Sequence, residues 1–164
     1  MSTIRIKVRK EVVLCEKCKK PKVFYYLSDF SYGEKLILIN DGIDYAYVNL
    51  FEDEVFDEFT LLVNQILKDY HKELSEVKII ETINCIFGVS CDYIDNKVVD
   101  SSVNDEKCTN CGSKKFEANL IEPEELVNIV VPQITHETWK TLSEDEKKKK
   151  IKQEIKRTNV FNDF

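Results

Sequence analysis

Two short stretches, residues 14–20 (LCEKCKK) and 107–115 (KCTNCGSKK), each contain a pair of cysteines separated by two residues. A Cys-x-x-Cys pair serves metal binding, a disulfide or thiol redox chemistry. Two such pairs together offer the four thiolates of a closed tetrahedral zinc site. We therefore expect one structural Zn²⁺ ion, with the ligands Cys15, Cys18, Cys108 and Cys111.

The spacing within each pair has a physical reason. Two intervening residues let both sulfurs face one ion, while backbone N–H groups after the first cysteine point at the sulfurs. A glycine directly after the second cysteine permits the turn that the chain then makes. Gly112 holds this position in the second pair, whereas Lys19 holds it in the first, which is the less regular of the two.

The residues around 14–22 and 107–116 resemble a zinc ribbon, the rubredoxin-like arrangement of two knuckles with four cysteine ligands. Between Cys18 and Cys108 lie 89 residues, against about 12–20 in compact sites with two pairs. The resemblance therefore implies a single domain with zinc-ribbon-like parts at residues 1–24 and 107–142. An acidic α/β insertion at 25–106 would lie between them, and a C-terminal helix at 143–157 would follow.

The segments before the predicted helices have strand patterns. Residues 4–9 alternate apolar and basic side chains, which is typical of a strand with one solvent-exposed face, and residues 23–27 (VFYYL) are rich in strand formers. Asp41-Gly42 favours a tight turn between strands at 35–40 and 43–50. These patterns predict antiparallel strands and a hairpin.

Apolar residues at helical spacing predict a long amphipathic helix at about 53–73. Residues 76–91 suit a helix or a strand, and residues 95–107 are polar and indicate a loop. A strand is expected at 115–121 and a helix start at Pro123, with Pro132 as an interruption. Ser143 and Glu146 form a capping box that opens a surface helix with Ile151 and Ile155 toward the core. The predicted fold class is α+β.

The remaining cysteines and His136 show no pattern that is typical of a functional site. Cys85 and Cys91 flank an apolar stretch and are expected to be small buried hydrophobes. His136 begins a sequence that starts like a metalloprotease helix, but the fifth position is Lys140, so the motif fails. The four glycines form no phosphate-binding loop. An enzyme is therefore the weaker hypothesis.

Charge is distributed unevenly along the chain. The net charge is −6, but residues 1–24 carry +6 and residues 25–106 carry −13. Such an acidic segment repels nucleic acid and attracts a basic protein partner. The candidate partner-binding residues lie on the hairpin and at the start of the long helix: Asp41, Asp44, Glu52, Asp53, Glu54, Asp57 and Glu58.

A small acidic protein of this kind resembles the bacterial immunity proteins, which neutralise a toxin, often a basic nuclease, by covering its active site. The resemblance implies a protein partner that binds these carboxylates. The competing interpretation is that they are ordinary surface charge. Two alternatives stay open. A nucleic-acid-binding or transcription accessory protein would use the basic arm at residues 5–22, and a thiol redox protein would work through Cys15 and Cys18.

The composition also bears on location. No apolar run reaches the length needed to cross a bilayer, and the first residues alternate apolar and basic side chains rather than forming a signal sequence. We expect a cytoplasmic protein. In that reducing setting, cysteines serve as thiols and metal ligands more often than as disulfides.

Overall fold

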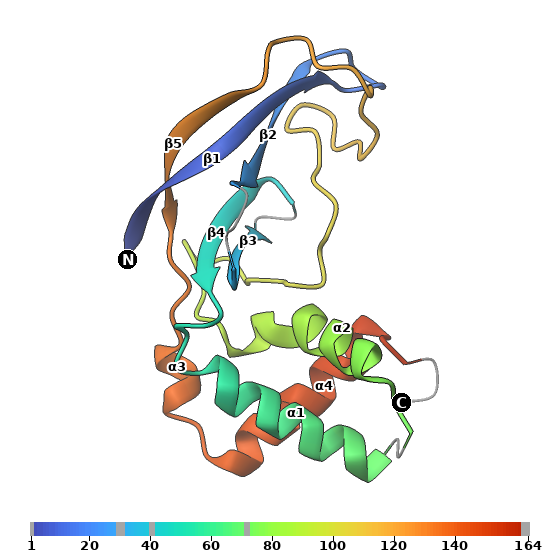
Figure 1. Cartoon of the computed structure of the whole chain (residues 1–164). Helices are drawn as coiled ribbons and strands as arrows, with labels where there is room; N and C mark the ends of the chain where they lie inside the picture. The colour runs from blue at the N-terminus through green and yellow to red at the C-terminus, as the bar shows by residue number, and fades with distance from the viewer. Residues whose placement is uncertain (1, 29–31, 40–41, 71–72, 162–164) are drawn as a thin grey trace. The chain divides into compact units, whose positions relative to one another are not determined.

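The computed structural model describes all residues except 1, 29–31, 40–41, 71–72 and 162–164. It divides into two compact units (Figure 1). The first unit comprises Met1–Phe51 and Asn104–Gln133, and the second comprises Glu52–Val103 and Ile134–Phe164. Helices and antiparallel strands both occur, so the predicted α+β class is confirmed.

Strand β1 (Thr3–Leu14) is the centre of the first unit. It pairs with β2 (Pro21–Leu27) on one side and with β5 (Glu125–Pro132) on the other, and both pairings are antiparallel. Ile6 and Val8 are buried while Arg5 and Lys7 are exposed. The alternation in the sequence thus marks the two faces of this strand, because successive side chains point to opposite sides of a sheet.

Strand β5 lies where the sequence predicts the start of a helix, and that prediction is wrong. Val127, Ile129 and Val131 recur at every second position and pair across the sheet with Val8, Ile6 and Ile4 of β1. Period-2 burial against a neighbouring strand outweighs the helix-starting character of Pro123 and the acidic residues after it. The strand predicted at 115–121 is also wrong, since only a single bridge, from Phe116 to Cys15, forms there.

The predicted hairpin is present as β3 (Glu34–Ile39) and β4 (Asp44–Asn49). Gly42 has a φ of +87°, as the turn requires, whereas Asp41 lies outside the described residues. Tyr47 of β4 joins a buried cluster with Ile6, Val8 and Val131. The hairpin and the three-stranded sheet thereby share one apolar core.

The second unit is helical (Figure 1). It contains α1 (Phe56–Tyr70), α2 (Glu76–Ile86), a 3-10 turn η1 (Phe87–Ser90), the short α3 (Glu137–Lys140) and α4 (Glu144–Thr158). The long amphipathic helix is confirmed as α1, and the ambiguous segment 76–91 is helical. The Ser75 hydroxyl accepts a hydrogen bond from the Lys78 N–H and caps α2.

Helix α4 begins with the predicted capping box, in which Ser143 and Glu146 bond each other's backbone N–H groups. Ile151 and Ile155 are fully buried, and α4 contacts both α1 and α2. The helix is thus a surface element anchored by a narrow apolar stripe. Within the described residues, every helix falls short of the length and apolar character that a membrane span requires.

Gly88 in η1 lies against the backbone of a later segment, and this contact yields a prediction. A Cβ atom there would stand 2.3 Å from the Val99 carbonyl oxygen and 2.9 Å from the Ser101 nitrogen. Gly88→Ala is expected to destabilise the second unit by about 1–3 kcal/mol, the usual cost of overpacking. Urea unfolding followed by the fluorescence of Trp139 measures this, and an unchanged midpoint would contradict the close approach.

Candidate metal centre

The two Cys-x-x-Cys segments form equivalent knuckles. In the first, the Cys15 N–H donates to the Lys20 carbonyl and the Lys19 N–H donates to the Cys15 carbonyl, at 3.0 and 2.9 Å. In the second, the Cys108 N–H donates to the Ser113 carbonyl and the Gly112 N–H donates to the Cys108 carbonyl, at 2.8 and 2.9 Å. Chain segments of different sequence therefore adopt the same hydrogen-bonded turn.

The residue after the second cysteine is left-handed in both knuckles, with φ of +59° at Lys19 and +74° at Gly112. Glycine adopts this conformation readily, whereas a residue with a Cβ atom pays about 1–2 kcal/mol. The backbone of Lys19 is therefore the strained one of the two. This is the position at which the first knuckle lacks the glycine that the second one has. The ammonium group of Lys19 forms an ion pair with Glu117.

Gly112 offers a test of this requirement. A Cβ atom on Gly112 would meet no atom within 4 Å, so only the left-handed backbone opposes an alanine there. Gly112→Ala is expected to cost about 1 kcal/mol of stability and to leave metal binding stoichiometric. Thermal unfolding and metal content of the variant would check this, and a loss of the metal would show that the knuckle tolerates no strain.

The backbone joins the two knuckles side by side. The Glu16 N–H donates to the Lys115 carbonyl, and the Glu117 N–H donates to the carbonyl of Leu14, at 3.0 and 2.8 Å. The bridge between Cys15 and Phe116 lies between these bonds. These contacts bring together the two pairs that the sequence separates by 89 residues.

The four predicted ligands cluster in the first unit. Their sulfur atoms all lie within 4.8 Å of one another, and the Cys15–Cys111 and Cys18–Cys108 sulfurs are 3.6 Å apart. A tetrahedral ion with metal–sulfur distances of about 2.3 Å requires sulfurs about 3.8 Å apart. The cluster therefore has the size for one metal ion, and its sulfurs are too far apart for disulfides.

Backbone N–H groups polarise the sulfurs as the knuckle geometry predicts. The N–H groups of Cys18 and Lys17 bond the Cys15 sulfur and lower its pKa against the effect of burial. The N–H of Lys20 does the same for Cys18 and lowers its pKa to about 6. At Cys111 the N–H of Ser113 lowers the pKa, but burial and the neighbouring thiols outweigh it and raise the value to about 11. Ionisation of all four thiols this close together would require a cation between them, which a bound metal ion supplies.

The predicted partner-binding carboxylates fall into three groups. Asp41 lies outside the described residues, and Asp44 is exposed in the first unit. Glu52, Glu54 and Asp57 are exposed in the second unit, where Glu54 forms an ion pair with Lys140. The last two, Asp53 and Glu58, make internal contacts.

Glu58 joins α1 to the C-terminal helices of its unit. Its carboxylate accepts hydrogen bonds from the Trp139 indole at 3.2 Å and from the Lys147 ammonium at 2.7 Å. Burial raises the pKa of Glu58, but these two donors outweigh burial and leave it lowered. The Lys147 side chain is only 11% exposed. This carboxylate thus stabilises the fold.

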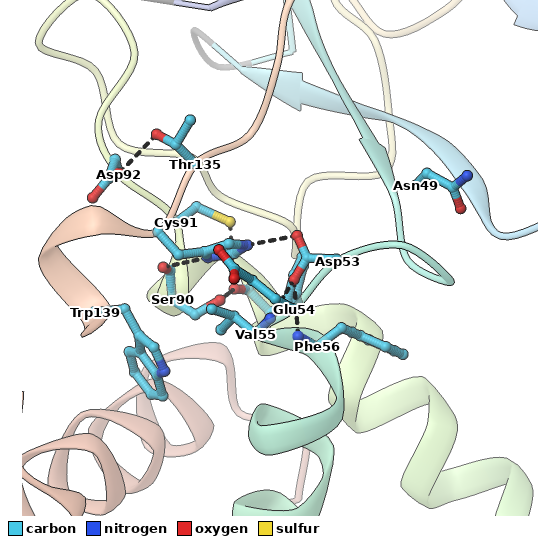
Figure 2. A network of polar contacts seen from close by, with 12 residues as sticks. Asn49, Asp53, Glu54, Val55, Phe56, Ser90, Cys91, Asp92, Thr135 and Trp139 are labelled. Atoms are coloured by element: carbon cyan, nitrogen blue, oxygen red, sulfur yellow. Dashed lines mark hydrogen bonds and ion pairs between the residues drawn. The ribbon is translucent and has the colours of Figure 1, made fainter.

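Sequence reasoning missed a buried pair formed by Asp53 and His136, whose side chains are 8% and 4% exposed. The Asp53 Oδ1 atom accepts from the N–H groups of Val55 and Phe56 at the start of α1, and Oδ2 lies 2.8 Å from His136 Nε2. Figure 2 shows Asp53 with its dashed contacts above the start of α1. The capping role was readable from an aspartate before a helix, whereas its partner 83 residues away was not.

The hydrogen bonds of His136 define its charge. Nδ1 lies 2.7 Å from the Ser90 carbonyl oxygen, which only accepts, so Nδ1 carries a proton. Burial lowers the pKa of His136, but the bonds to Asp53 and Ser90 outweigh it and leave the pKa raised. The pKa of Asp53 is lowered, because the bonds from His136 and Phe56 outweigh its burial. Both shifts favour an imidazolium facing a carboxylate.

Cys91 lies in the same region as Asp53 (Figure 2) but lacks the environment of a nucleophile. Burial raises its pKa strongly, and the charge of Asp53 adds to the effect. Its thiol lies 3.6 Å from the Phe87 carbonyl oxygen and donates to it. Both nitrogens of His136 already contact acceptors, so the ring has no free position for a proton from Cys91. Cys91 is the buried small side chain that the sequence predicts, while Cys85 is half-buried.

Comparisons with protein-family models, with curated proteins and with solved structures find no match for this chain.

Proposed function

We propose that this chain is a non-enzymatic binding protein whose first unit is held together by one structural Zn²⁺ ion. The observation that carries the proposal is the cluster of four cysteine sulfurs within 4.8 Å of one another. Four protein ligands complete a tetrahedron and leave no position for water or substrate, so the ion would stabilise the fold and not catalyse. Zinc is the usual occupant of such closed four-thiolate sites, and iron also accepts them.

Metal analysis tests this directly. The chain is purified without chelator, its metal content is measured, and its reactive thiols are counted before and after chelation. One zinc per chain, with four thiols released only by the chelator, is the expected result. Metal-free protein with a freely reactive Cys15 and Cys18 would contradict it and favour the thiol redox alternative.

The binding function rests on the net charge of −6 and on the exposed carboxylates Glu52, Glu54 and Asp57 of the second unit, of which Glu54 also pairs with Lys140. Charge of one sign steers an oppositely charged partner and fixes its orientation. We propose a basic protein as the partner, with neutralisation of a toxin as the form of the activity. The reducing cytoplasm, where thiolates persist, is the proposed location.

Matched charge variants test the partner surface. A triple variant, Glu52→Gln, Glu54→Gln and Asp57→Asn, removes three charges from the proposed surface. The control removes three charges elsewhere in the same unit, by changing Glu73, Glu76 and Glu81 to glutamine. Against a panel of inactivated basic nuclease domains, we expect binding that the first triple weakens at least ~10-fold and the control leaves nearly unchanged. Equal effects of both triples would contradict the surface.

The nucleic-acid alternative is weaker because the net charge is −6 and because three residues of the basic arm, Arg9, Lys10 and Lys19, form ion pairs. Arg9 lies 3.3 Å from Glu11 and 3.5 Å from Glu124, and Lys10 lies 3.3 Å from Glu125. Side chains already paired with carboxylates offer less to a phosphate backbone. Binding to bulk DNA or RNA with a steep salt dependence would reverse this preference.

A further inference from the structure

A hollow of about 460 Å³ lies in the first unit, along β2 and the strands of the hairpin. Residues 104–106, Lys114 and Phe116 form another wall. This volume lies in the range of small-molecule sites, which are mostly apolar with few polar groups. Aromatic rings make up much of the lining, from Phe24, Tyr25, Tyr26, Tyr45 and Phe116. The proposed binding surface and the cysteine cluster do not account for this hollow.

One lining carboxylate has an unexplained atom. Among the described residues, the Oε2 atom of Glu106 is buried and has no hydrogen-bond partner. Burial raises the pKa of this carboxyl group to about 7, against the opposing attraction of Lys22. The neighbouring carboxylate of Asp105 lies 4.0 Å from the Lys114 ammonium, which offsets its charge. A buried polar atom without a partner costs about 1–3 kcal/mol, and more if charged. Such an atom calls for a partner that the described residues do not supply.

The rings that line the hollow together with Glu106 suit a positive charge. Phe24 and Phe116 meet edge to face at 4.9 Å, and Tyr25 and Tyr45 do so at 6.0 Å. The Lys22 ammonium already stands 5.6 Å from the centre of the Phe24 ring. Aromatic faces attract ammonium and guanidinium groups by about 0.5–2 kcal/mol each.

We propose that this hollow binds a small organic cation, an ammonium or guanidinium group on an apolar or aromatic stem. The cationic group lies at Glu106 and supplies the partner that Oε2 lacks, while the stem packs against Phe116 and the tyrosine rings. This inference goes beyond the proposed function and is independent of it.

The test titrates the full chain, as purified, with benzyltrimethylammonium and with phenylguanidinium, and follows backbone amides by NMR. Saturable shifts at residues 24–26, 104–106 and 116 are expected, with neutral benzyl alcohol at least ~10-fold weaker. Shifts elsewhere, or equal binding of benzyl alcohol, would overturn the proposal. An alanine–arginine–alanine peptide that binds more tightly than phenylguanidinium would overturn the small-molecule assignment.

Three variants distinguish the charge of Glu106, the ring of Phe116 and the nonspecific effect of removing one negative charge nearby. Glu106→Gln keeps the size of the side chain and is expected to weaken cation binding ~10-fold or more. Asp105→Asn removes the same charge one residue away and is expected to change binding less than ~2-fold. Phe116→Leu keeps apolar bulk but removes a ring, and is expected to weaken binding several-fold. The proposal would be overturned if the Glu106→Gln and Asp105→Asn proteins bound the cations with equal affinity while their NMR spectra without ligand showed an unchanged fold.

Discussion

Cys108→Ser is expected to abolish stoichiometric metal binding and to unfold the first unit at ordinary temperature. Cys108 is 3% exposed and lies 3.6 Å from Cys18, so serine would place a hydroxyl, which binds zinc poorly, among three thiols. Zinc contributes about 10–16 kcal/mol of folding free energy in zinc-finger peptides. A domain has only about 5–15 kcal/mol of net stability. Loss of the proposed zinc ion is therefore expected to be enough to unfold this unit.

Metal content and cobalt substitution measure the first effect, because Co²⁺ bound by four thiolates gives a characteristic visible spectrum. Circular dichroism of the β-structure measures the second. Cys85→Ser is the matched control, since it also removes one thiol but lies outside the cluster. It is expected to retain the metal. A Cys108→Ser protein that keeps both its metal and its thermal stability would contradict a four-cysteine site.

The knuckles, the hairpin and two long helices were predictable because each depends on residues close together in the sequence. Cys108 and Gly112 define a knuckle by spacing alone, and Ser143 with Glu146 defines a helix start. Such signals are read without knowledge of the fold. The proximity of the two cysteine pairs was also predictable, because a tetrahedral zinc site needs four ligands and each pair supplies only two.

Strand β5 and the buried pair were not predictable in this way. Strand β5 follows Pro123, which favours a helix start, and its pairing with β1 joins residues more than a hundred positions apart. The segment forms a strand and not a helix because its alternate apolar side chains are buried against Ile6 and Val8. Asp53 shows the same limit, because among several neighbouring acidic residues only the fold shows which carboxylate meets His136.

Asp53→Ala is expected to destabilise the second unit by about 3–5 kcal/mol, the usual cost of breaking a buried ion pair from one side. The change removes the cap of α1 and leaves the His136 ring without its carboxylate. Unfolding in urea followed by Trp139 fluorescence measures the loss, because this is the single tryptophan and it lies in the same unit. Asp57→Ala, at an exposed position in the first turn of α1, is expected to cost less than about 1 kcal/mol. Equal costs would show that the pair contributes nothing beyond surface charge.

The pH dependence of Asp53→Asn isolates the charge. Asparagine can still cap α1 through its oxygen, and its amide can donate to Nε2 of a neutral His136. In the wild type, the raised pKa of His136 gives stability that is complete below its ordinary pKa of 6.5 and is lost as the pH rises through the folded value. The lowered pKa of Asp53 gives stability that is present above 3.8 and is lost as the pH falls through the folded value. The ion pair therefore contributes most between pH 3.8 and 6.5.

In the Asp53→Asn protein the buried ring loses the carboxylate that bonds it, and the charge of Asp92 and the Ser90 carbonyl remain as the groups that favour its protonation. Because burial opposes them, the folded ring is expected to stay neutral while the unfolded chain binds a proton below pH 6.5. The stability of this variant relative to the wild type should then fall by about 1.4 kcal/mol for each pH unit below that point. Near pH 8 the two proteins should differ by about 1 kcal/mol or less, since cap and hydrogen bond both remain. Parallel stability curves from pH 8 to pH 5 would contradict an imidazolium in the folded state. A gap that opens on acidification would show that this carboxylate acts through its charge on His136.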